Sequence, residues 1–169
     1  MSGQLVARSS AQVRTARIVR AAMLLGAVVL VCVDLALKAL AESLLSNGKV
    51  IDLGLINLRL LYNPGVAFSF GADLPAWAIV AVTGLIIAGL TWYAVSSAPA
   101  MGRMSRAGAT LLLGGAFGNF IDRLDGRGVV DYLHTGWFAT FNLADVFVTA
   151  GVVLYALGAL RPAPSKGGD

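Results

Sequence analysis

Acidic and amide side chains occur in the second half of the chain at spacings that could support acid–base chemistry. Asn119 and Asp122 are three residues apart, so on a helix both side chains would share one face. Asp131 lies in the segment that follows, and Asp145 lies near the start of a later apolar run, behind Asn142. These residues are the first candidates for a functional site.

Paired carboxylates could activate a water molecule. Two carboxylates in a partly dry site do not easily both ionise, because repulsion and desolvation raise the pKa of one of them. The ionised member can then take a proton from water, while the protonated member donates a hydrogen bond to a scissile carbonyl. This chemistry needs acids on separate elements. Asp131 on a loop and Asp145 on a helix satisfy that requirement, and Asp122 with Asp131 is the weaker alternative.

Asp34 and Lys38 form a second candidate group, inside the first apolar run. They are four residues apart, one helical turn along the same face. One interpretation is a local ion pair whose lysine extends outward to the interface. However, ionisable groups within membrane spans usually face the bundle interior and mark function.

Other catalytic chemistries have less support. A serine–histidine nucleophile would depend on His134, the one histidine, and the chain has no Gly-x-Ser-x-Gly elbow. A zinc site is not expected from one histidine and one cysteine, Cys32. We therefore expect neither a metal nor another cofactor.

The elements that must position these residues are membrane helices. Of the 169 residues, 57% are hydrophobic and 13% charged, against about a quarter charged in soluble domains. Apolar runs cover residues 21–41, 75–95, 104–121 and 141–160. The net charge of +4 does not indicate a nucleic-acid partner, because the basic residues lie at the edges of these runs. The sequence predicts an all-α integral membrane protein, with four transmembrane helices in one domain spanning residues 21–160.

The distribution of Lys and Arg predicts the orientation. Residues 1–20 form a basic leader, expected to be poorly ordered, and the 97–106 connection and the 161–169 tail are also basic. The connections 42–74 and 122–140 hold most of the acids. The positive-inside rule therefore places both termini in the cytoplasm and the two long loops outside. The candidate acids then gather near the outer interface.

The first outer loop has its own pattern. Residues 50–62 partly alternate between apolar and polar, which predicts one or two short strands. Asn63, Pro64 and Gly65 then favour a turn. An ordinary surface hairpin is one interpretation, but the apolar character favours a small β-containing region on the membrane surface.

With these motifs in place, the chain resembles bacterial lipoprotein signal peptidases, also called signal peptidase II. The resemblance covers residues 21–160 and depends on five segments in the family's order. They are Asp34 to Lys38, Asn63 to Phe68, Gly114 to Arg123, Val129 to Tyr132, and Phe141 to Asp145.

The resemblance implies an inner-membrane aspartic endopeptidase that cuts prolipoproteins just before their diacylglyceryl-modified cysteine. By position, Asp131 and Asp145 correspond to the catalytic pair. The supporting and substrate-contacting positions correspond to Asp34, Lys38, Asn63, Gly65, Asn119, Asp122, Arg123 and Asn142. The implied partners are diacylglyceryl-modified prolipoproteins and membrane lipid, and we expect a monomer with its active site at the outer face.

Two other classes of protein compete with this hypothesis. A small four-span transporter could use its acids to bind protons or cations, but a coupling acid would be expected near the middle of a span. A membrane scaffold packed through glycine-rich helices would leave the acidic cluster unexplained. The peptidase hypothesis accounts for the cluster best.

Overall fold

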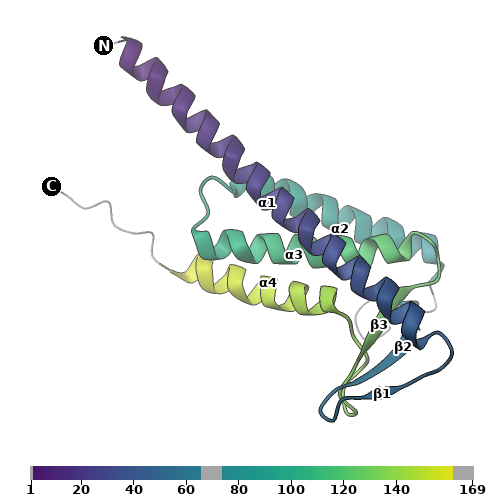
Figure 1. Ribbon diagram of the computed structural model, residues 1–169. Helices are drawn as coiled ribbons and strands as arrows, with labels where there is room; N and C mark the ends of the chain where they lie inside the picture. Colours follow the sequence, from purple (N-terminus) through teal and green to yellow (C-terminus); the bar gives the residue numbers. More distant parts are fainter. Residues whose placement is uncertain (1, 66–73, 162–169) are drawn as a thin grey trace.

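A computed structural model describes residues 2–65 and 74–161, with side chains from residue 10 onward. In chain order its elements are α1 (Ser2–Leu45), β1 (Ile51–Asp52), β2 (Asn57–Asn63), α2 (Ala76–Ser97), α3 (Arg103–Arg123), β3 (Val129–His134) and α4 (Leu143–Leu160). The helices lie alongside one another, and the strands lie together at one end (Figure 1). The prediction of a mainly helical protein with a small β region is confirmed.

Three helices within the described part of the chain are long and apolar enough to cross a membrane: α1, α2 and α4. Their most apolar windows have mean hydropathies of 2.3, 2.0 and 2.0. Helix α3 is less apolar, since arginines, glycines and polar residues occupy many of its positions. It packs against each of the other helices, and most extensively against α4. A helix enclosed in this way needs fewer apolar residues than one surrounded by lipid.

Helix α1 differs from the expectation for residues 1–20. It begins at Ser2 and runs for 44 residues. The basic leader is therefore the first part of the same helix that contains the first apolar run, and is not a separate, poorly ordered segment. At about 1.5 Å per residue, a helix of this length measures about 66 Å, roughly twice the hydrocarbon thickness of a bilayer. Its first part projects beyond the other helices (Figure 1).

Glycines bring α3 and α4 into backbone contact. A side-chain carbon at Gly115 would collide with the carbonyl oxygen of Ala144, and one at Gly151 would lie 2.5 Å from the backbone nitrogen of Leu112. Small residues allow such close approach between helices. The α4 segment that begins after Asn142 is therefore fixed directly against α3.

The strands form one antiparallel sheet in the order β1-β2-β3. Strand β1 pairs Ile51 with Leu58, and β2 pairs Leu61 with Asp131 on β3. One or two short strands were expected between residues 50 and 62, and two are present. Asp131, expected on a loop, lies instead in β3, because the chain pairs with β2 from Val129 to His134, with a register shift between Leu58 and Leu61.

The sheet is attached to the end of α1 by an apolar cluster. Ala41 and Leu45 of α1 pack against Val130 and Tyr132 of β3. Because Asp131 lies between those two buried residues, this packing holds its strand against the helices.

Candidate functional site

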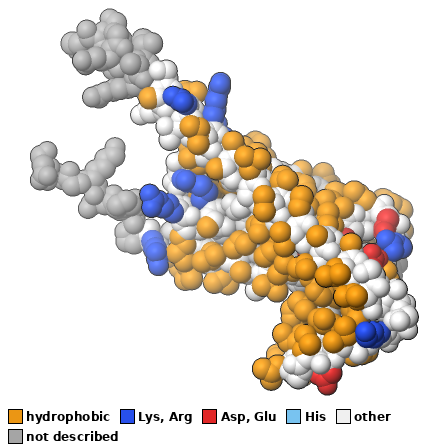
Figure 2. All heavy atoms as spheres, viewed as in Figure 1, with side chains coloured by type: hydrophobic (Ala, Val, Ile, Leu, Met, Phe, Trp, Pro, Cys, Tyr) orange, Lys and Arg blue, Asp and Glu red, His pale blue; other side chains and the backbone are white. Residues whose placement is uncertain are grey.

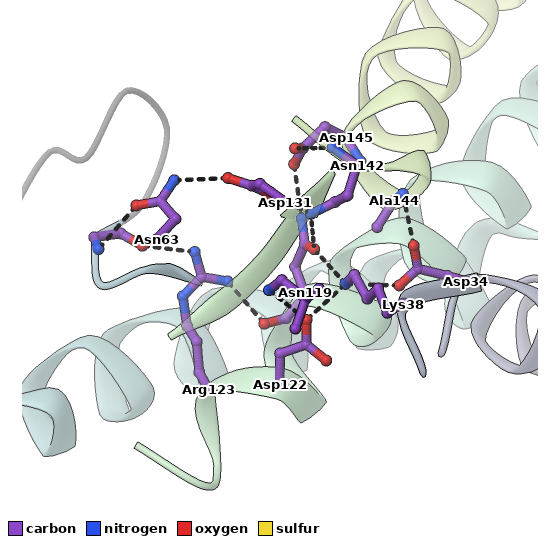
Figure 3. Close-up of polar contacts among 12 residues, drawn as sticks. Asp34, Lys38, Asn63, Asn119, Asp122, Arg123, Asp131, Asn142, Ala144 and Asp145 are labelled. Carbon is purple, nitrogen blue, oxygen red and sulfur yellow. Dashed lines mark hydrogen bonds and ion pairs between the residues drawn. The ribbon is translucent and has the colours of Figure 1, made fainter. Parts of the chain in front are cut away.

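Polar groups from five segments of the chain converge where the sheet meets the helices (Figure 3). They include every sequence-predicted site residue: Asp34, Lys38, Asn63, Gly65, Asn119, Asp122, Arg123, Asp131, Asn142 and Asp145. One of the contacts, between Asp34 and Ala144, joins residues 110 positions apart. Their functional roles stay predictions, whereas their convergence is a feature of the fold.

Lys38 is the charged centre of this cluster. Its side chain is only 2% exposed, and its Nζ lies 2.8 Å from Asp34 Oδ2 and 2.9 Å from Asp122 Oδ2. It also donates a 2.9 Å hydrogen bond to Asn119 Oδ1. The interpretation of Lys38 as a lysine extending outward is therefore wrong. The ion pair with Asp34 exists, but it is buried and shared with α3, as a buried charge requires.

Asp34 also holds the start of α4. Its Oδ1 accepts a 2.9 Å hydrogen bond from the backbone N–H of Ala144. Gly118 leaves room for this carboxylate, since a side-chain carbon there would lie 2.5 Å from Asp34 Oδ2. The contribution of Ala144 was missed from the sequence, because a backbone donor carries no signal in its side chain.

Two asparagine amides connect this charged centre to the other acids. Asn119 accepts from Lys38 through Oδ1 and donates from Nδ2 to Asp145 Oδ1 at 2.7 Å. Asn142 donates from Nδ2 to Asp131 Oδ1 at 2.7 Å and to Asn119 Oδ1 at 3.1 Å. Each amide thus uses both its donor and its acceptor, so its orientation is determined by its neighbours.

Asp145 is oriented by the first turn of α4. Asn142 caps the helix by accepting from the Asp145 N–H at 3.0 Å, and Asp145 Oδ2 accepts from the Asn142 N–H at 3.2 Å. This reciprocal capping box fixes the carboxylate at a helix N-terminus, where the backbone dipoles favour negative charge.

Asp131 is almost fully buried, with 2% of its surface exposed. Its pKa is raised to about 6, first by burial and then by the nearby Asp145 carboxylate. The amide hydrogen bonds from Asn63, at 3.3 Å, and from Asn142 oppose the rise, because they favour the ionised form. A carboxyl group with such a pKa can hold a proton near neutral pH.

Arg123 connects α3 to the turn that follows β2. Its Nη1 donates to the Asn119 carbonyl at 2.8 Å, and its Nη2 donates to the Gly65 carbonyl at 2.9 Å. The Gly65 N–H in turn donates to Asn63 Oδ1 at 3.1 Å, which holds the side chain that contacts Asp131. The turn expected at residues 63–65 is present, and the chain bends at Gly65.

The acids therefore divide into two kinds. Asp34 and Asp122 are ion-paired with Lys38, and Asp122 Oδ2 also accepts from the Val130 N–H. Within the described residues, Asp131 and Asp145 have no ion pair and are held by neutral amides. The second kind is the more open to proton exchange, because an ion pair favours the ionised form of its acid.

An apolar groove adjoins Asp145. It has a volume of about 420 Å³ and is lined by Trp137, Phe138, Phe141 and the first half of α4. Trp137 is 84% exposed and stacks edge-on against Phe138, so the groove has an open aromatic wall. The carboxylate lies at the border between a polar cluster and an apolar surface.

Comparisons with known proteins agree with this arrangement. A family model described as Signal peptidase (SPase) II matches residues 26–161. The lipoprotein signal peptidase of Bartonella quintana (strain Toulouse) is 35% identical over 144 residues, which cover 82% of this chain and 86% of its own. That of Brucella ovis (strain ATCC 25840 / 63/290 / NCTC 10512) is 40% identical over 132 residues, which cover 75% and 82%.

The chain belongs to the signal peptidase II family. The resemblance inferred from its five motifs is confirmed. As a signal peptidase II it is a hydrolase of the aspartic type and a bacterial membrane protein. Nothing in the comparisons supports the transporter alternative.

Solved structures give the same fold. A bacterial membrane enzyme determined at 2.3 Å resolution is similar to this signal peptidase II, with a TM-score of 0.73 and 25% identity over 88% of this chain and 93% of that chain. A second such enzyme, at 1.9 Å, has a TM-score of 0.69 and 26% identity.

Proposed function

We propose that this chain removes signal peptides from prolipoproteins by cleaving just before the diacylglyceryl-modified cysteine, with Asp131 and Asp145 as the catalytic pair. The observation that carries the assignment is the division among the acids. Lys38 forms ion pairs with Asp34 and Asp122, while Asp131 and Asp145 are held by asparagine amides near one another. An acid locked in an ion pair exchanges protons poorly, whereas one held by neutral donors can gain or lose a proton.

The raised pKa of Asp131 supports an assignment of roles. Asp131 carries the proton and donates a hydrogen bond to the scissile carbonyl oxygen. Asp145, at the N-terminus of α4, is the ionised base.

The reaction then needs only water. Asp145 takes a proton from a water molecule as its oxygen attacks the carbonyl carbon, and Asp131 stabilises the charge that develops on the carbonyl oxygen. When the tetrahedral intermediate collapses, the carbon–nitrogen bond breaks. The leaving amine then receives a proton from the pair.

The membrane arrangement follows from helix packing and charge. Helix α3 lies between α1, α2 and α4, so we infer four spans, with α3 enclosed by the other three. The start of α1 and the end of α4 lie at the same end of the bundle, which is rich in arginine (Figures 1 and 2). Both termini are then cytoplasmic, and the site is at the outer interface of the inner membrane.

A site at the outer membrane interface suits a lipid-modified substrate. A signal peptide and two acyl chains lie in the bilayer, so the bond to be cut is near the interface. The groove of Trp137, Phe138 and Phe141 beside Asp145 offers an apolar surface at that level. All ten site residues come from one chain, which supports a monomer as the active form.

The test is cleavage of a diacylglyceryl-modified precursor by purified Asp131→Asn and Asp145→Asn variants. Each should lower turnover by about 10²-fold or more, because each removes a proton-transfer group. The control is Asp52→Asn, an exposed acid whose Oδ1 accepts from the Gly54 N–H and whose amide analogue can still accept that bond. Near-normal turnover in either site variant would refute the assignment. Proton-coupled flux in liposomes without cleavage would favour a transporter instead.

A further inference from the structure

A second groove lies at the opposite end of the bundle from the acids. It has a volume of about 920 Å³ and is formed by the ends of α2 and α4 and the start of α3. Its polar lining includes Tyr93, Ser97, Arg103, Arg106, Tyr155 and Arg161. The proposed peptidase chemistry does not use any of these residues.

The groove is basic, and the acids within residues 10–65 and 74–161 lie toward the other end of the bundle. Arg14, Arg17 and Arg20 lie at the same end of α1, whereas the first acid in the sequence is Asp34. In the space-filling view the side chains at this end include blue ones, while both red and blue ones are seen at the other end (Figure 2). Within residues 10–65 and 74–161, no ion pair involves Arg103 or Arg161, and both side chains are exposed. Among the described residues, these two cations thus line the groove without an acid paired to either of them.

The groove is also amphipathic. The hydroxyl groups of Tyr93 and Tyr155 lie 2.9 Å apart, so they bridge α2 and α4 across α3. Met101, Met104 and Ala159 add apolar surface to the same groove. A ligand that fits would combine a negatively charged head with an apolar body.

Arg106 has a different part in this groove. It donates to the carbonyl oxygens of Ala98 and Met101, at 3.3 and 2.8 Å, and so fixes the connection between α2 and α3. Arg103 and Arg161 are therefore the two arginines available to contact a ligand directly.

We propose that this groove binds an anionic phospholipid, whose phosphate is held between Arg103 and Arg161 and whose acyl chains pass along the apolar ends of α2 and α4. A membrane supplies this ligand at the level where the helices end, and arginine pairs well with phosphate oxygens. The proposal does not depend on the identity of the catalytic pair.

Arginines at helix ends also serve as ordinary orientation signals, so the test must separate a site from general positive charge. The matched pair is Arg103→Gln/Arg161→Gln in the groove and Arg14→Gln/Arg17→Gln on the projecting part of α1. Both double variants remove two positive charges from the same end. Each is purified in a zwitterionic detergent, where equal unfolding temperatures would establish that both are folded.

Native mass spectrometry measures how much dioleoyl phosphatidylglycerol each protein retains. Thermal unfolding measures how far the same lipid raises the unfolding temperature. Phosphatidylcholine is the control lipid in both experiments. The wild-type protein and the α1 variant should retain phosphatidylglycerol and be stabilised by it. The groove variant should bind it about tenfold or more weakly. Equal retention of the two lipids by the wild-type protein, or an equal loss in both double variants, would overturn the proposal. Stabilisation by inorganic phosphate alone, equal to that by the lipid, would overturn it as well.

Discussion

Lys38 on α1 and Asn119 on α3, 81 positions apart in the sequence, are joined by a 2.9 Å hydrogen bond from the lysine Nζ to the amide Oδ1. This contact is where the charged part of the site meets the part held by amides. On one side, Lys38 binds Asp34 and Asp122; on the other, Asn119 binds Asp145. The position of the proposed base thus depends on a lysine that does not contact it.

Replacing Lys38 by methionine should destabilise the protein strongly. Asp34 and Asp122 would lose their cation while staying largely buried, at a cost of about 3–5 kcal/mol. Unfolding by denaturant in detergent measures this change. Lys49→Met is the control, because Lys49 is exposed and has no ion pair within the described residues. Equal stability of the two variants would show that Lys38 does not compensate the two acids.

Replacing Asn119 by alanine should lower turnover by about 10- to 100-fold, since one hydrogen bond to the Asp145 carboxylate is lost. The effect should fall on kcat more than on KM, because the bond orients the base and does not bind substrate. Steady-state kinetics with a lipidated precursor separate the two parameters. A rise in KM with unchanged kcat would assign Asn119 to substrate binding instead.

The pH dependence should report the proton on Asp131. Its pKa in the folded protein is raised to about 6, above the ordinary value of about 4, so the folded state holds this proton across that interval. Both the stability gained from this proton and the activity that requires it should therefore fall as the pH rises through about 6. The profile of kcat/KM against pH should have its alkaline limb there.

Asn63→Ala should move that limb to higher pH. The Asn63 amide donates to Asp131 Oδ2 and favours the ionised form, so its removal should raise the pKa of Asp131 further. Asn47→Ala, a change in the exposed turn after α1, is the matched control and should leave the limb in place. A shift to lower pH in Asn63→Ala would contradict the assignment of the proton to Asp131.

Adding one methyl group at Gly115 should disturb the site from a distance. The new carbon would collide with the Ala144 carbonyl oxygen, so α4 must move away from α3, at a cost of about 1–3 kcal/mol. Asn142 and Asp145 lie at the start of that helix, so activity should fall together with stability. Gly89→Ala on α2 has open space around the new carbon and should change neither. Stability and cleavage are measured for both variants. Equal stability and equal activity of Gly115→Ala and Gly89→Ala would exclude the close packing of α3 against α4.

Most of the helices and strands of this protein could be predicted from local features of its sequence. Apolar length determines where helices form, so the runs 75–95, 104–121 and 141–160 correspond closely to α2, α3 and α4. Alternation within residues 50–62 identified strands β1 and β2. The i,i+4 spacing of Asp34 and Lys38 made a local ion pair one of two interpretations, and that ion pair is present. These predictions succeed because they depend on periodicity and composition within a short stretch of chain.

The tertiary structure decided which acids are neutralised and which are not. Nothing in the spacing of Asp122 and Asp131 indicates that the first would contact Lys38 and the second would join a strand. Those outcomes depend on the register of β2 against β3 and on glycines that bring α3 close to α1 and α4. Both are contacts between segments distant in the chain, which local propensities do not encode. The motifs therefore determined which residues would meet, and the packing of α1, α3, β3 and α4 determined how their charges are shared.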